Sequence, residues 1–152
     1  MSWSDEPPED RLEKPTIREI IKRGRSEIIE FFPSIPDEED DLAREACGIG
    51  NHKGGVILVG VNSSGEIKGI SDTDAIFDRV AEILEDLIEP SLRYVMHVYE
   101  IDDKNLLLIR IKKFSNLPFA MDRRFYLRKS KKSRPIPPST VRDLIDSNSD
   151  DS

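Results

Sequence analysis

A short, almost wholly apolar run at residues 56–61 is the strongest constraint on the fold of this chain. The run reads VILVGV. It is too short for an ordinary helix and too apolar for a strand with one face in water, so it predicts a central strand covered on both faces. Gly54 and Gly55 allow a sharp turn before it, and Gly60 indicates that another backbone passes close by. The NSSG sequence that follows predicts a hairpin connection into a short strand over residues 66–70.

Helices and strands alternate along the rest of the chain. Apolar residues spaced by three and four predict helices, whereas β-rich runs between turn residues predict strands. The expected helices cover residues 16–23, 37–51, 74–88 and 139–145, and the expected strands cover residues 26–32, 93–101, 106–113 and 123–129. These elements predict a mixed-sheet α/β or α+β domain, with about six strands paired in hairpins and three to four helices.

Length and cysteine content favour one domain in a reducing compartment. A chain of 152 residues can bury a core of its own, and its single cysteine, Cys47, excludes an internal disulfide. We expect one domain over residues 15–146, between disordered acidic tails at residues 1–14 and 147–152. No run is apolar enough for a membrane span, and the start lacks the features of a signal peptide, so we expect a cytoplasmic protein.

Charge is unevenly distributed along the chain. The formal net charge of −7 disfavours a nucleic-acid partner when it is considered alone. Residues 123–134, however, contain seven lysine or arginine residues and no acid. A chain that is acidic overall can therefore still present one basic face to a polyanion.

Alternation along residues 123–129 predicts which side chains share a face. It places Arg124, Tyr126 and Arg128 on one face, which we expect to be exposed and cationic, and Phe125 and Leu127 on the other, which we expect to be core. The cations can contact phosphates while Tyr126 stacks or forms hydrogen bonds. The cations that follow this strand are expected to lie in a loop. The candidate nucleic-acid-binding residues are Arg123, Arg124, Tyr126, Arg128, Lys129, Lys131, Lys132 and Arg134, together with Asn51 and Lys53 at the turn before the central strand.

Other interpretations of these patterns compete with nucleic-acid binding. The acidic run at residues 37–41 is explained by helix capping and solvation, and it competes evenly with phosphate as the partner of the basic residues. Gly55 and Gly60 have the spacing of a phosphate loop, but Val61 and Asn62 stand where lysine and serine or threonine are required, so the residues do not support ATP binding. Neither histidine has a second ligand at metal spacing, and no metal or other cofactor is expected.

An ordered set of residues resembles the Schlafen/AlbA-like DNA-binding domain, once labelled a divergent AAA domain. The matching features are the SEIIEF segment, Asn51, Gly54-Gly55, Gly60-Val61, the G-x-x-x-G-I of residues 65–70, the I-x-P of residues 88–90 and the FYLR of residues 125–128. The similarity spans residues 17–145. It implies a mixed α/β fold and binding of DNA or RNA, with regulation of transcription as one role. The old AAA label alone would attach ATP binding to such a sequence.

Some eukaryotic relatives in this family cleave RNA with three carboxylates. When their motif is laid on this chain, Arg25 stands at the first acid, Glu30 at the second and Asn62 at the third. One carboxylate is too few to hold a divalent metal for phosphodiester hydrolysis by this route. We therefore expect a non-catalytic nucleic-acid-binding module. The alternatives are a metal-dependent nuclease built on Glu27 and Glu30, and a protein-interaction domain that forms homodimers.

Overall fold

The computed structural model describes residues 14–150, which form two four-stranded sheets and four helices. The elements in chain order are α1 (Lys14–Arg23), β1 (Ile29–Phe32), α2 (Glu39–His52), β2 (Gly55–Val59), α3 (Thr73–Leu87), β3 (Ile88–Glu89), β4 (Tyr94–Ile101), β5 (Lys104–Ile111), β6 (Ala120–Met121), β7 (Arg124–Lys129), β8 (Lys132–Pro135) and α4 (Pro138–Asp150). The predicted mixed α/β fold is confirmed, although the strands number eight within the described residues.

The expected tails fall largely outside the part of the chain that the structure describes. Residues 1–13 and 151–152 lie outside it. Helix α4 continues to Asp150, so residues 147–150 are helical and the expected boundary at residue 147 is wrong. No helix among the described residues is both long and apolar enough to cross a membrane.

The first sheet has the order β1-β2-β5-β4, so β2 is an interior strand. β1 runs parallel to β2, and the other neighbours are antiparallel. Ile57 and Val59 belong to the hydrophobic cluster of α2 and α3, whereas Leu58 belongs to the cluster on the opposite face. The central strand covered on both faces is therefore confirmed. A Cβ atom on Gly55 would lie 2.1 Å from the carbonyl oxygen of Ile28, so the close approach of the neighbouring chain requires glycine there.

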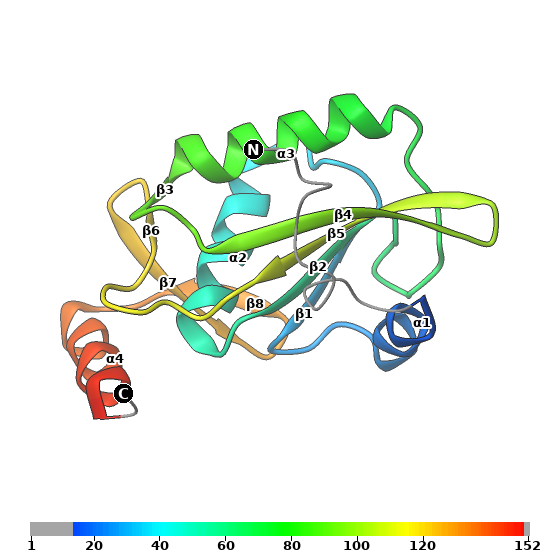
Figure 1. Ribbon diagram of the computed structural model, residues 1–152. Coiled ribbons are helices and arrows are strands. Elements are labelled where there is room, and N and C mark those ends of the chain that lie inside the picture. The colour runs from blue at the N-terminus through cyan, green and yellow to red at the C-terminus, as the bar shows by residue number, and fades with distance from the viewer. Residues whose placement is uncertain (1–13, 151–152) are drawn as a thin grey trace.

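Helix α2 lies between the two sheets, and small residues allow this position (Figure 1). The second sheet has the order β3-β6-β7-β8, and α2 packs against β7 and β8 on one side and against β2 on the other. A Cβ on Gly48 would lie 1.9 Å from Ser133 Oγ, and a Cβ on Gly50 would lie 2.8 Å from the Phe119 ring. Cys47, on the same helix, is fully buried. Helix α2 therefore sets the positions of both sheets.

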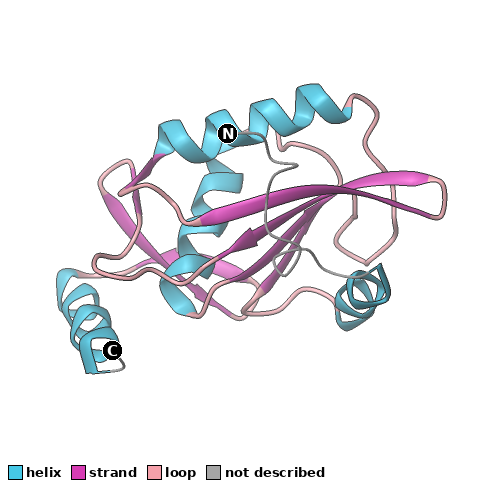
Figure 2. Cartoon of the chain, viewed as in Figure 1, coloured by secondary structure: helices cyan, strands magenta, loops and turns pink. Residues whose placement is uncertain are grey.

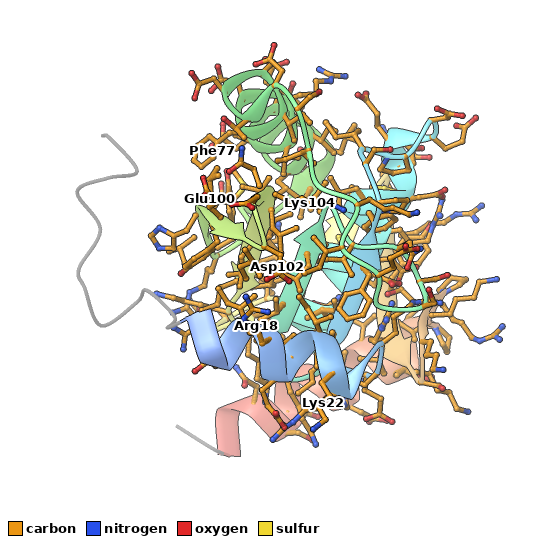
Figure 3. All side chains as sticks on the ribbon, turned by 90° about the vertical axis from the view of Figure 1, so that its right-hand side faces the viewer. Arg18, Lys22, Phe77, Glu100, Asp102 and Lys104 are labelled. Atoms are coloured by element: carbon orange, nitrogen blue, oxygen red, sulfur yellow. The ribbon has the colours of Figure 1, made fainter. Side chains whose placement is uncertain are left out.

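The other helices lie at the outside of the molecule (Figure 2). Helix α3 begins at the N-cap residue Asp72, whose side chain accepts a hydrogen bond from the backbone N–H of Ala75, and packs on the α2 side of the first sheet. Helix α1 covers the opposite face through the buried Ile17. Figure 3 shows Arg18 of α1 beside Asp102 at the tip of the β4–β5 hairpin, with which it forms an ion pair of 2.8 Å.

Besides the two-residue strands β3 and β6, which the sequence did not predict, two segments differ from the sequence prediction. Residues 66–70 form isolated bridges, from Val61 to Ile67 and from Ile70 to Asn105, instead of a strand. Residues 132–135 form β8, although their KSRP sequence has no apolar alternation and suggested a loop. The strand forms because β8 pairs with β7 after a tight turn, in which Ser130 has a φ of 60°. The basic loop expected from the sequence is thus half of a hairpin.

Candidate nucleic-acid interface

Most of the basic residues between 123 and 134 lie on the β7–β8 hairpin. The strands are antiparallel, with Arg128 opposite Ser133 and Lys129 opposite Lys132. Residues directly opposite each other point to the same face of an antiparallel pair. The hairpin therefore has an inner face toward α2, which includes Tyr126 and Arg128. Its outer face carries Phe125, Leu127, Lys129, Lys132 and Arg134.

The inner face is buried, which corrects the predicted orientation of β7. Tyr126 is 6% exposed, and its ring centroid lies 5.7 Å from the guanidinium carbon of Arg44 on α2. Arg128 is 2% exposed. The alternation correctly grouped Tyr126 with Arg128 but assigned their face to solvent, because arginine and tyrosine are usually exposed and phenylalanine and leucine are usually buried. Neither side chain is placed to contact a nucleic acid.

Four oxygen atoms accept hydrogen bonds from the guanidinium of Arg128. Its Nη1 donates to Glu30 Oε2 at 3.0 Å and to Glu45 Oε1 at 2.6 Å. Its Nε and Nη2 both donate to the carbonyl oxygen of Ser26, at 3.1 and 2.9 Å, and Nη2 also donates to the carbonyl oxygen of Ile29 at 3.0 Å. All three guanidinium nitrogens are thus engaged inside the protein, and the planar fork of arginine suits such an arrangement.

The two carboxylates that bind Arg128 have further partners. Glu30, 3% exposed, accepts a hydrogen bond of 2.5 Å from Arg25 Nε, and this bond raises the pKa of the Arg25 guanidinium. Glu45 Oε1 accepts a hydrogen bond of 2.9 Å from the backbone N–H of Ser133. Two arginines and two glutamates therefore form a balanced charge network that ties β1 and α2 to the hairpin. Burial of charged groups is tolerated when they are paired in this way.

The residues of the nuclease alternative do not come together. Glu30 belongs to the buried network, whereas Glu27 is exposed and lies 3.0 Å from His52 Nε2. Asn62 closes a turn, because its Oδ1 accepts a hydrogen bond of 3.1 Å from the backbone N–H of Ser64. Within residues 14–150, no group of three or more histidine, cysteine, aspartate or glutamate residues is arranged to hold a metal ion.

Asn51 holds the loop that leads into the second sheet. It is fully buried, and its Nδ2 donates to the carbonyl oxygens of Phe119 at 2.9 Å and Tyr126 at 2.8 Å. Its Oδ1 accepts a hydrogen bond of 2.7 Å from the backbone N–H of Phe119. The predicted phosphate contact of Asn51 is therefore wrong, since the amide already satisfies three buried backbone groups. Lys53, two residues further on, is exposed.

Six of the seven predicted cations between residues 123 and 134 remain on the surface. They are Arg123, Arg124, Lys129, Lys131, Lys132 and Arg134, all exposed. None of them forms an ion pair within the described part of the chain. Two acids of the run at residues 37–41 have partners elsewhere: Glu39 pairs with Arg79 on α3, and Asp41 pairs with Arg44 at 2.7 Å. Carboxylates of the protein itself thus neutralise Arg128, whereas these six cations remain exposed.

A second basic surface was not predicted. Lys53, Arg110, Lys112 and Lys113, which we call the sheet-end patch, border a hollow of about 410 Å³ beside Gly54. The turn after α2 and the end of β5 bring these side chains together. Lys53 is far from the others in sequence, so no basic run reveals the cluster. The signal that was available is the pair Lys112-Lys113 directly after the apolar part of β5.

Residues 26–137 match the family model described as Schlafen, AlbA_2. The chain belongs to the Schlafen AlbA_2 family. The matched segment contains all eight strands, helices α2 and α3, and therefore the whole β7–β8 hairpin. None of the curated proteins with which the sequence was compared matches it.

Two solved structures are similar to this Schlafen AlbA_2 domain. The crystal structure of the DIP2311 protein from Corynebacterium diphtheriae has 18% sequence identity and a TM-score of 0.59, over 78% of this chain and 23% of that chain. The solution structure of the N-terminal domain of a RecG-related protein from Nitrosomonas europaea has 16% identity and a TM-score of 0.48, over 63% of this chain and 72% of that one. The likeness to the DIP2311 protein shows a shared fold, and the chain spans about a quarter of that protein's length.

Proposed function

We propose that this domain binds nucleic acid without cleaving it, through the outer face of the β7–β8 hairpin. The observation that carries the proposal is the strand register, which gathers Lys129, Lys132 and Arg134 on one exposed face. Membership of the Schlafen AlbA_2 family supports it, because the resemblance to that family implies binding of DNA or RNA. Phosphate contacts of this kind fix the position of a protein on a nucleic acid but carry no sequence information.

The stability of the hairpin alone does not explain this arrangement. Lys129 and Lys132 lie directly opposite each other, and like charges at opposed positions destabilise a strand pair. A polyanion bound across the outer face relieves that repulsion. Charged residues also protect the exposed edge of a sheet from pairing with other chains, and β8 is an edge strand. Edge protection accounts for Lys132 and Arg134 on β8, but it does not account for Lys129 on the adjacent strand.

The non-catalytic part of the proposal rests on Glu30. Its carboxylate is bound by Arg25 and Arg128, so coordination of a metal ion would require breaking one buried and one partly buried ion pair. Removing one partner from such a pair is costly, because the other charge stays buried. We therefore expect the domain to bind nucleic acid and to leave the nucleic acid uncleaved.

The test compares two double charge reversals that change the net charge equally. The first variant is Lys132→Glu/Arg134→Glu on the outer face. The control is Lys22→Glu/Lys104→Glu, whose side chains lie around α1 and the β4–β5 hairpin (Figure 3). Binding of single- and double-stranded DNA and RNA is measured by fluorescence anisotropy from about 20 mM salt upward, a range chosen because counterion release makes phosphate binding strongest at low salt.

We expect the outer-face variant to bind on the order of tenfold or more weakly. Its binding constant should also depend less on salt: the slope of log binding constant against log salt concentration should be shallower by about 0.7–0.9 for each phosphate that the variant no longer neutralises. The control should bind as the unmodified protein does. Equally weakened binding in both variants, or no binding to any probe at the lowest salt concentration, would refute the proposal. Probe cleavage in Mg²⁺ or Mn²⁺ that disappears in Glu30→Ala would instead support the nuclease alternative.

A further inference from the structure

The outer face continues, at the base of the hairpin, into a hollow of about 440 Å³. Its apolar surface comes from Phe125 on β7, Ile136 after β8 and Val141 on α4. Arg123 and Arg124 also line it. We call this hollow the Phe125 pocket. Because Phe125, Lys129 and Arg134 share one face of the sheet, a ligand can lie along the cations and enter the pocket without changing sides.

Phe125 also borders a second, different hollow. This second hollow, about 710 Å³, is lined by Phe125 and Val141 as well, but its charged residues are Glu85 and Glu89. The two hollows therefore share apolar residues and differ in the sign of their charge. A polyanion is attracted to the pocket with two arginines and repelled from the one with two glutamates, so charge selects the Phe125 pocket for an anionic ligand.

Helix α4 forms one wall of the pocket, and it is anchored at both ends. Just before its start, the backbone N–H of Ile136 donates to the carbonyl oxygen of Phe125 on β7 at 3.0 Å. Near its end, the amide of Asn148 donates to the carbonyl oxygen of Ser115 at 2.5 Å. Between them, Leu144 packs against the main hydrophobic core. The wall is therefore fixed relative to the sheet, and the pocket exists without a ligand.

We infer that the Phe125 pocket receives an unstacked base of a single-stranded nucleic acid whose phosphates contact the outer face. This inference rests on the proposed function and adds a substrate class to it. A base has a flat apolar surface that stacks on an aromatic ring, and it is linked to the anionic backbone that the cations bind. A paired base in a duplex is already stacked on its neighbours, so a duplex cannot fill the pocket without local unpairing.

Two substitutions test the pocket in different ways. Phe125→Leu keeps an apolar side chain and removes the ring. Val141→Trp fills the space from the α4 side. The control is Ser147→Trp, which adds the same side chain to an exposed position of α4 that lines neither hollow. Circular dichroism and thermal unfolding establish that each variant is folded before binding is measured.

The probes are a single-stranded oligonucleotide, its duplex, and the same single strand with abasic sites throughout, each made as DNA and as RNA. For the unmodified protein we expect the single strand to bind on the order of tenfold or more tightly than the abasic strand, the effect of one stacked base. Phe125→Leu and Val141→Trp should remove that difference, and Ser147→Trp should keep it. A 2-aminopurine base in the probe should become brighter when the unmodified protein takes it out of its stack, and less so with Phe125→Leu.

The outcomes separate this inference from the proposed function. If the native and abasic strands bind equally well, and Val141→Trp behaves like Ser147→Trp, the base pocket is refuted while phosphate binding stands. If no probe binds, both proposals fail. If Val141→Trp leaves probe binding unchanged but alters the oligomeric state in analytical ultracentrifugation, the pocket joins two copies of the chain and the inference is also refuted.

Discussion

Arg128 and Lys129 are neighbours in β7 and carry the same charge, yet their surroundings are opposite. The guanidinium of Arg128 lies between Glu30 and Glu45 and is almost fully buried. The ammonium of Lys129 is exposed, lies across from Lys132, and has no ion pair among the residues that the structure describes. A cation in this hairpin is therefore structural or available to a ligand according to the face on which it lies.

The chemistry of the two side chains fits these positions. Arginine presents several donors in a rigid plane and is weakly hydrated, so it can satisfy oxygen atoms that surround it in a buried site. Lysine carries a compact, strongly hydrated charge on a flexible stem and is suited to an exposed surface. The density of cations in the sequence does not distinguish the two roles. The comparison predicts that substitutions on the inner face mainly change stability, whereas substitutions on the outer face mainly change binding.

The largest expected effect is on the inner face. Arg128→Ala leaves Glu30 and Glu45 with a buried negative charge that Arg25 alone cannot balance, and breaking such a pair costs about 3–5 kcal/mol. Urea unfolding monitored by circular dichroism gives the change in the free energy of unfolding. The triple variant Arg128→Met/Glu30→Gln/Glu45→Gln should recover much of this stability, because it removes the charges together. A destabilisation below about 1 kcal/mol in Arg128→Ala would mean that the inner face is not held by charge.

A smaller effect on stability is expected from pH, through Cys47 on α2, the helix against which the inner face packs. Burial raises the pKa of this thiol from 9.0 to about 12, so the folded state keeps the thiol protonated after the unfolded chain has ionised. The stabilisation is complete below pH 9 and is lost as the pH rises toward 12, by about 1 kcal/mol from pH 9 to pH 10. Comparison of urea unfolding at these two pH values with Cys47→Ala isolates the effect. Equal pH dependence in both proteins would show that the thiol does not contribute.

The smallest expected effect is on the outer face and has the opposite sign. Lys129→Glu replaces the repulsion with Lys132 by an attraction, so we expect the hairpin to be stabilised by about 0.2–1 kcal/mol. The same variant should bind nucleic acid more weakly, because it removes a cation that binds phosphate. Thermal unfolding and anisotropy on one preparation measure both quantities. Destabilisation comparable to that of Arg128→Ala would abolish the distinction between the two faces.

Sequence patterns predicted the first sheet well and the second sheet poorly. The central strand β2, helix α3 and the β4–β5 hairpin were recognisable because their apolar spacing is set by one dominant environment, the core. In the second sheet, β8 was predicted as a loop because its four residues KSRP contain no large apolar side chain. It is held by pairing with β7 and by the fit of Ser133 against Gly48, interactions between residues that are not sequence neighbours.

The candidate site was predicted in part. The segment rich in cations and its membership of a strand were recognised, and six of its cations are exposed. The burial of Arg128 and the role of Asn51 were missed, because the acceptors for both side chains come from other elements. The sheet-end patch was missed for the same reason, since Lys53 and Arg110 meet only when α2 and β5 are brought together.

By itself, the sequence determined the periodic elements, the family resemblance and the location of a basic segment in an acidic chain, because these depend on residues that are close in the chain. Only the tertiary structure decided which face of β7 turns inward. That choice depends on two glutamates, Glu30 from β1 and Glu45 from α2, which close around Arg128 once the hairpin packs on the helix. A strand alternates its side chains in either orientation, and the partner that it packs against selects between them.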